Sequence, residues 1–176
     1  MLVFGISTST LYTLSALYHL RELRRPARQR LMRTLDHAGI FIGIAGTYTS
    51  FCLLVLQGWQ RIALLAAIWL CALAGIALKI AWPGMSRQLS TYLYGSMGWT
   101  GMLVLPAFWR ALPPPALALL LLGGSLYTLG AAIYAWRWPD PFPRVFGYHE
   151  IFHLLVIGGN AVVTVVLLRW VVPGIP

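Results

Sequence analysis

The sequence predicts an all-α fold, a polytopic bundle of transmembrane helices that forms a single domain over residues 1–176. Of these residues, 59% are hydrophobic and only 10% are charged, which is unlike a soluble domain of this length. The hydrophobic residues gather in long runs, and the basic residues that give the net charge of +9 lie in short gaps between them. Because the basic residues form neither a basic helix nor an aromatic platform, we expect no nucleic-acid partner.

Six apolar runs are long enough to cross a bilayer, which takes about 20 residues per helix. We expect these helices at residues 1–20, 36–57, 62–82, 89–109, 116–136 and 146–172. Short polar or proline-rich gaps separate them, and no long linker divides the chain.

The orientation of the helices follows from the gap between the first two runs, an Arg-rich loop at residues 21–35. Six of its residues are arginines, and by the positive-inside rule it lies in the cytoplasm: Arg21, Arg24, Arg25, Arg28, Arg30 and Arg33. Alternation then places four more basic residues on that side and three outside: Lys79, Arg87, Arg137 and Arg144, against Arg61, Arg110 and Arg169. We therefore expect a multi-pass protein of the plasma or inner membrane.

The first run begins at residue 1, without the basic segment and the small-residue cleavage site of a signal peptide. Its amino terminus would lie outside, and a helix that starts there at the first residue is unusual. We expect that truncation or a late start codon has removed a preceding helix.

The last run carries a polar seam within Gly147–Thr164. Counting about 100° per residue, His149, His153, Asn160 and Thr164 share one face of an otherwise apolar helix. In lipid such a face is costly unless it meets protein, metal or water, so its ionisable residues are functional candidates.

The predicted topology brings all four histidines to the cytoplasmic leaflet. His19 ends the first run on a stripe with Thr8, Tyr12 and Ser15. Asp36 shares a face with small residues that let helices approach closely, so it is expected to face the bundle: Gly39, Gly43, Gly46, Thr47 and Ser50. His37 lies about 100° from Asp36 and is expected to face headgroups or another subunit.

Three neutral imidazoles and a water form the open tetrahedral site of a catalytic zinc ion. His19, His149 and His153 are the candidate ligands. Asp36 is the candidate that orients the water and accepts its proton, supported by Ser15 one turn before His19. The alternative is a set of structural or interfacial histidines that pair with backbone and headgroups.

The segment from His149 to His153, HEIFH, also matches the HExxH signature of zinc proteases, in which Glu150 would act as the general base. Such proteases usually take their third ligand from downstream. No His, Asp, Glu or Cys follows His153, and short matches arise easily, so this interpretation is disfavoured.

Four segments resemble the haemolysin III branch of the progestin and adipoQ receptor family, which is related in motif to the alkaline ceramidases. They are SALYH (residues 15–19), LDHAGIFIGIAGTYTSF (35–51), GGSLYTLGAAIY (123–134) and FGYHEIFH (146–153). The resemblance implies a seven-helix fold whose first helix has no counterpart here. It also implies a Zn²⁺ site near the cytoplasmic face, with His19, His149 and His153 as ligands and Asp36 beside the water.

The resemblance leaves three functions open. A zinc-dependent hydrolase of lipid amides, similar to a ceramidase, is favoured by the chemistry of the candidate site, with membrane lipids as partners and substrates. The alternatives are a receptor or regulator with structural zinc, and a cytolytic pore. The pore is the least supported, because no run carries charged residues through its whole depth.

Overall fold

The computed structural model describes residues 1–20, 26–142 and 145–173. Their helices fall into two compact units, unit 1 (Met1–Met85) and unit 2 (Ser86–Pro176). Each unit is described by itself, and the predicted single domain stays a prediction. Arg21, Arg24, Arg25 and Arg144 lie outside the described residues.

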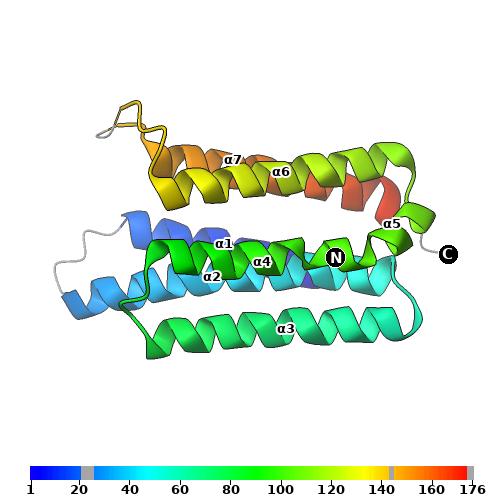
Figure 1. The fold of residues 1–176 in the computed structure, drawn as a ribbon, viewed down its shortest axis with the longest axis horizontal. Coiled ribbons are helices and arrows are strands. Elements are labelled where there is room, and N and C mark those ends of the chain that lie inside the picture. Colours follow the sequence, from blue (N-terminus) through cyan, green and yellow to red (C-terminus); the bar gives the residue numbers. More distant parts are fainter. Residues whose placement is uncertain (21–25, 143–144, 174–176) are drawn as a thin grey trace. The chain divides into compact units, whose positions relative to one another are not determined.

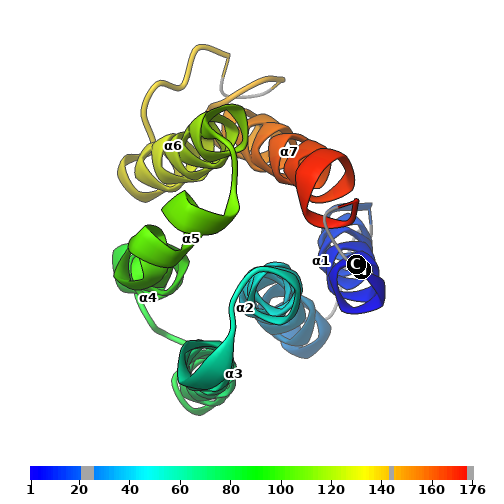
Figure 2. The same ribbon diagram turned by 90° about the vertical axis from the view of Figure 1, so that its right-hand side faces the viewer.

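Unit 1 consists of three helices, α1 (Leu2–Leu20), α2 (Pro26–Leu54) and α3 (Gly58–Ala81). The second helix lies between the other two and packs against both (Figures 1 and 2). The turn from α2 to α3 is short because Gly58 adopts φ +57°, a left-handed conformation that glycine reaches without steric cost.

The prediction that residues 21–35 form a loop is wrong for its second half, because α2 begins ten residues before the predicted Asp36. Proline is tolerated at the start of a helix, where its missing N–H would have no intrahelical partner. The segment after Pro26, ARQRLMR, consists of residues with high helix propensity, so the helix continues beyond its apolar part. Arg28, Arg30 and Arg33 are therefore helical residues.

Glycines set the close packing within unit 1, as the small-residue face of α2 predicts. Gly39 and Gly43 lie against Leu11 of α1, and Gly46 lies against Ser7. On the next interface the ring of Phe41 lies directly against Gly75 of α3. The expectation that His37 faces headgroups or another subunit is wrong, because its side chain is buried, with 4% exposed.

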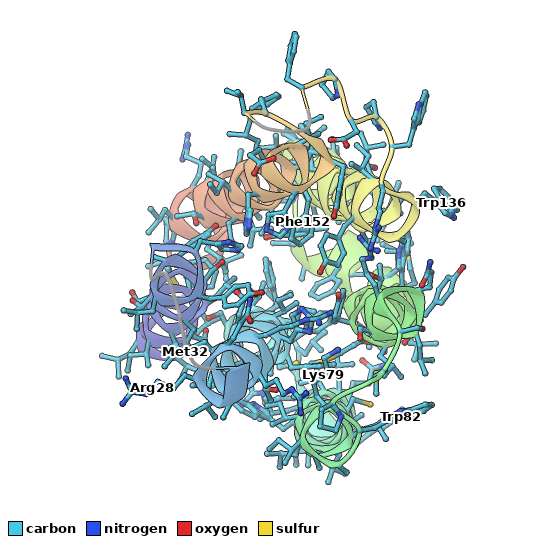
Figure 3. All side chains as sticks on the ribbon, turned by 90° about the vertical axis from the view of Figure 1, so that its left-hand side faces the viewer. Arg28, Met32, Lys79, Trp82, Trp136 and Phe152 are labelled. Atoms are coloured by element: carbon cyan, nitrogen blue, oxygen red, sulfur yellow. The ribbon has the colours of Figure 1, made fainter. Side chains whose placement is uncertain are left out.

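Unit 2 contains α4 (Arg87–Trp99), the 3-10 helix η1 (Thr100–Val104), α5 (Leu105–Ala111), α6 (Pro114–Trp136), α7 (Tyr148–Val166) and the π-helix η2 (Leu167–Val171). The long helix α6 lies between α4 and α7 (Figure 2). Trp136, at the end of α6, projects away from its helix and is 71% exposed (Figure 3).

The predicted fourth helix at 89–109 is not one regular α-helix, because η1 interrupts it between α4 and α5. Pro106 accounts for the break, since it lacks the N–H that would continue an α-helix and its ring clashes with the preceding turn. The α-helix resumes at Leu105, with Pro106 in its first turn.

The all-α transmembrane class is confirmed. Among the described residues, four helices are long and apolar enough to cross a membrane: Ala27–Leu54, Gly58–Ala81, Pro114–Trp136 and Tyr148–Val171. These correspond to four of the six predicted runs. The other two runs are occupied by α1 and by the interrupted segment from α4 to α5.

Candidate metal site

The amino terminus of α7 is held by two carboxylates. The backbone N–H of Gly147 donates to Oε2 of Glu150 at 2.8 Å, and that of Tyr148 donates to Oδ1 of Asp140 at 3.1 Å. The first N–H groups of a helix have no intrahelical acceptor, and their dipoles favour negative charge nearby. A side chain at position 147 would collide with Asp140, which explains the glycine there. These contacts fix where the first turn of α7 begins.

The two histidines of this turn approach each other through their outer ring nitrogens. Nε2 of His149 lies 3.1 Å from Nε2 of His153, and the rings meet edge to face with their centroids 4.6 Å apart. Two imidazole nitrogens that bind one tetrahedral zinc ion at about 2.0–2.1 Å are about 3.3 Å apart. The pair is thus close to the separation that chelation of one metal ion requires.

Aromatic side chains surround His149. The ring of Tyr134, on α6, lies 5.7 Å from that of His149 and 4.9 Å from that of Phe152. Figure 3 shows Phe152 between α6 and α7, where it also contacts Gly130. The imidazole of His149 therefore lies beside an aromatic wall formed by Tyr134 and Phe152.

Arg87, at the start of α4, contacts the two tyrosines that lie beside His149, Tyr134 and Tyr148. Its Nη1 lies 3.3 Å from the hydroxyl of Tyr148, and its guanidinium carbon lies 5.5 Å from the ring centroid of Tyr134 and 5.7 Å from that of Tyr148. Such cation–π contacts are worth about 0.5–2 kcal/mol, depending on their exposure to water. Arg87 thus helps to fix the two tyrosines next to His149.

Asn160 and Thr164, the two residues of the predicted polar seam that follow the histidines, form hydrogen bonds within unit 2. The Tyr127 hydroxyl of α6 donates to Oδ1 of Asn160 at 2.8 Å, and the Thr164 hydroxyl donates to the carbonyl of Asn160 at 2.7 Å. Tyr127 also packs on Gly159, which leaves room for its ring. Asn160 therefore joins α7 to α6, whereas the bond of Thr164 stays within α7.

In unit 1 the other predicted site residues lie together. The Ser15 hydroxyl of α1 hydrogen-bonds the carboxylate of Asp36 on α2, and His19 is close enough to interact electrostatically with the same carboxylate. Ser15 and Asp36 are each 9% exposed, whereas His19 is exposed and stacks edge to face with Tyr18. The predicted proximity of Ser15, His19 and Asp36 is thus present in the unit.

The five predicted site residues form two groups, His149 with His153 in unit 2, and Ser15 with His19 and Asp36 in unit 1. The proximity within each group agrees with the facing that the sequence indicates. That the two groups combine into one metal site stays a prediction.

Comparison with known proteins places the chain in a family. Residues 1–164 match the family described as Haemolysin-III related. Hemolysin-3 of Bacillus cereus is 37% identical over 171 residues, which are 97% of this chain and 74% of that protein. The Hemolysin-3 homolog of Bacillus subtilis (strain 168) is 36% identical over 159 residues, or 90% of this chain and 71% of that protein. The chain belongs to the haemolysin III-related family.

The chain is also similar to a more distant relative outside the haemolysin III-related family. An adiponectin receptor protein of Drosophila melanogaster is 28% identical over 148 residues, which cover 73% of this chain and 32% of that receptor. This similarity supports the place of this haemolysin III-related chain in the superfamily that its motifs suggest.

Three residues that support the site in this haemolysin III-related chain were not identified from the sequence. Asp140 is one of only four acidic residues, and this scarcity is a signal that it has a partner. Arg87 and Tyr127 gave no comparable signal. Their partners lie on other helices, and sequence spacing predicts contacts only along one helix.

Proposed function

We propose that the protein is a zinc-dependent membrane hydrolase that cleaves amide bonds of lipids, with His19, His149 and His153 as metal ligands. The observation that carries this proposal is the separation of 3.1 Å between the Nε2 atoms of His149 and His153. Two acceptor nitrogens at this distance repel each other when both rings are neutral, unless one carries a proton toward the other or a cation joins them. A hydrogen bond holds the two rings together when one of them carries its proton on Nε2, and a shared metal ion would hold them at nearly the same separation.

The donor set suits zinc. Three imidazoles form a catalytic zinc site that keeps one position open, whereas calcium and magnesium prefer oxygen ligands. When bound, zinc supplies a Lewis acid that polarises a carbonyl and lowers the pKa of a coordinated water toward about 7.

The chain's own residues supply the proton transfer. One carboxylate oxygen of Asp36 accepts the Ser15 hydroxyl, and this bond fixes the orientation of the carboxylate. The second oxygen is then available to accept a proton from the attacking water and to deliver it to the amide nitrogen that leaves. Ser15 acts here as a positioning residue.

These groups belong to helices of a membrane protein, so the substrate we propose is a lipid amide such as a ceramide, which reaches the site from the bilayer. We also propose that residues 21–35, which include the start of α2, lie in the cytoplasm of a cell whose plasma or inner membrane holds the protein. Labelling of an Arg28→Cys variant from the cytoplasmic side only, in a cysteine-free background, would support this topology.

The test combines metal analysis with activity. Purified wild-type protein should contain about one zinc per chain, and the double variant His149→Ala/His153→Ala should contain none. Asp36→Asn should keep the zinc and lose the release of fatty acid from a fluorescent ceramide. A wild-type protein without stoichiometric zinc would refute the metal site, and an Asp36→Asn variant with full turnover would refute the proton transfer.

Cytolysis is the second candidate, favoured by the name of the Bacillus relatives, Hemolysin-3. Leakage of a dye from liposomes that contain the protein separates the two functions. Leakage that persists in Asp36→Asn and in the double histidine variant would support a pore and contradict the hydrolase. Zinc without either leakage or turnover would favour the third candidate, a receptor or regulator with structural zinc.

A further inference from the structure

The loop between α6 and α7, residues 137–147, exposes several of its large apolar side chains. Trp138 is 75% exposed, Phe142 is 65% exposed and Val145 is 84% exposed. Trp136, the last residue of α6, directly precedes the loop and projects away from its helix (Figure 3). Large exposed apolar patches, unlike single exposed residues, mark surfaces that bind another protein or a membrane. The loop is therefore a candidate binding surface, and the proposed hydrolase does not use these side chains.

The loop joins two helices that are each long and apolar enough to cross a membrane, Pro114–Trp136 and Tyr148–Val171. The first of them ends because Arg137 adopts φ +56°, a left-handed conformation that stops an α-helix, and Pro139 follows two residues later. In Figure 1 the loop extends past the ends of α6 and α7. It therefore lies at one surface of the membrane that these helices cross.

The backbone of the loop forms hydrogen bonds of its own. The N–H of Phe142 donates to the carbonyl of Phe146 at 3.1 Å, and the N–H of Phe146 donates back to the carbonyl of Phe142 at 2.8 Å. The N–H of Val145 also donates to the carbonyl of Phe142, at 2.9 Å. These bonds place the two phenylalanines opposite each other, as in an antiparallel pair of strands.

Neighbouring backbone donors are bonded as well, or are missing from the sequence. The N–H groups of Gly147 and Tyr148 donate to the carboxylates of Glu150 and Asp140. Three residues of the loop have no backbone N–H, because they are prolines: Pro139, Pro141 and Pro143. A backbone N–H that leaves water without an acceptor is costly, so these bonds and prolines make it easier for the loop to enter a layer with little water.

The composition of the loop suits the headgroup layer of a bilayer. Aromatic residues such as Trp136 and Trp138 are enriched at this level, where the ring meets apolar atoms and the indole N–H meets water. Two basic residues of the loop, Arg137 and Arg144, add the charge that anionic headgroups attract. The loop is also continuous with α6 and α7, which already contact lipid. The bilayer is therefore the partner that reaches this surface without any further chain.

We propose that residues 137–147 form a membrane-binding loop, which folds onto the bilayer and inserts Trp138, Phe142 and Val145 at the level of the lipid headgroups. Asp140 of the same loop accepts the Tyr148 N–H at 3.1 Å, so the inserted loop is tied to the first turn of α7. Lipid contact thereby holds that turn, which carries His149, at the membrane surface. The contact with lipid is measured without metal or turnover, so this proposal and the proposed hydrolase fail separately.

The experiment places a nitrobenzoxadiazole fluorophore on the full chain in liposomes of phosphatidylglycerol and phosphatidylcholine. The label is attached to Val145→Cys in a cysteine-free background. Its emission should be shifted to the blue, quenched by lipids that carry a nitroxide on the headgroup, and protected from iodide in the water. Arg28→Cys, labelled in the same way, is the matched control, because Arg28 is an exposed residue in the polar first turns of α2. Its label should emit as in water and be quenched by iodide, which shows that the fluorophore alone does not seek lipid.

A second change tests the inserted side chains. Phe142→Ser, added to the labelled Val145→Cys protein, alters an exposed ring and leaves the backbone bonds in place. It should shift the equilibrium of the loop between lipid and water about tenfold toward water. Phe142→Trp should keep the lipid quenching.

Three outcomes would overturn the proposal. The first is iodide quenching as strong at position 145 as at position 28, which would place the loop in water. The second is a label shielded from both iodide and nitroxide lipid, which would indicate contact with protein, such as a second copy of this chain. The third is lipid quenching at position 145 that Phe142→Ser leaves unchanged.

Discussion

Replacement of Glu150 by glutamine separates two roles for this residue, a helix cap and the general base of an HExxH protease. In the structure Glu150 is exposed, and its Oε2 accepts the Gly147 N–H at 2.8 Å. Glutamine has the same length and still offers an oxygen acceptor, so the hydrogen bond can persist. What disappears is the negative charge at the amino terminus of α7.

We expect Glu150→Gln to lower the free energy of unfolding only slightly. A charge at a helix terminus contributes about 0.3–1 kcal/mol to the free energy of unfolding. For a chain of this size, a loss of about 1 kcal/mol lowers the unfolding temperature by about 2–4 °C. Glu150→Ala also removes the hydrogen bond and should cost about 1 kcal/mol more.

The assay measures unfolding temperature in detergent, zinc content and lipid-amide hydrolysis on the same preparations. Glu150→Gln should keep its zinc and its turnover and lose at most a few degrees. Asp140→Asn, which changes the other carboxylate at this helix terminus, is the matched control and should behave alike. If Glu150→Gln abolished turnover while zinc and unfolding temperature stayed at wild-type values, Glu150 would be a catalytic base and the capping role would not explain it.

Three further predictions concern packing and metal. Gly75→Ala should lower the free energy of unfolding by about 1–3 kcal/mol, because the added methyl group collides with the Phe41 ring, whereas Gly124→Ala, with open space around it, should be neutral or slightly stabilising. Thermal unfolding of both variants checks this, and an equal effect would contradict the packing. Tyr127→Phe should cost about 1–3 kcal/mol in the same assay, because it leaves Oδ1 of the buried Asn160 without its donor at 2.8 Å. Removal of metal by a chelator should lower the unfolding temperature of wild type and leave that of the double histidine variant unchanged, since a ligand stabilises only the folded state that binds it; equal shifts in both proteins would speak against the site.

The sequence by itself determined the fold class, the number of apolar runs and the facing of the candidate residues. Hydropathy detects the fold class and the apolar runs because lipid selects for long runs of apolar side chains. The facing follows from the helical spacing of about 100° per residue. The spacing of His149 and His153 was sufficient to predict their contact, since residues four apart on a helix always share a face. The same reasoning predicted that Asp36 faces the bundle on a stripe of glycines, and the structure of unit 1 shows that α1 is the helix opposite them.

Helix boundaries needed the tertiary structure. The helix α2 starts at Pro26, well before its apolar part, because backbone hydrogen bonds do not end where hydrophobic residues end. The break after Trp99 depends on Pro106, and a hydropathy average does not register that proline lacks the backbone N–H that an α-helix needs.

Partners on different helices also needed the tertiary structure. Tyr127 meets Asn160 and Arg87 meets Tyr148 only because particular helices pack at particular registers. A one-dimensional pattern states which face a residue occupies on its own helix. Which side chain lies opposite is decided by the packing of large and small residues across the interface, such as Phe41 on Gly75.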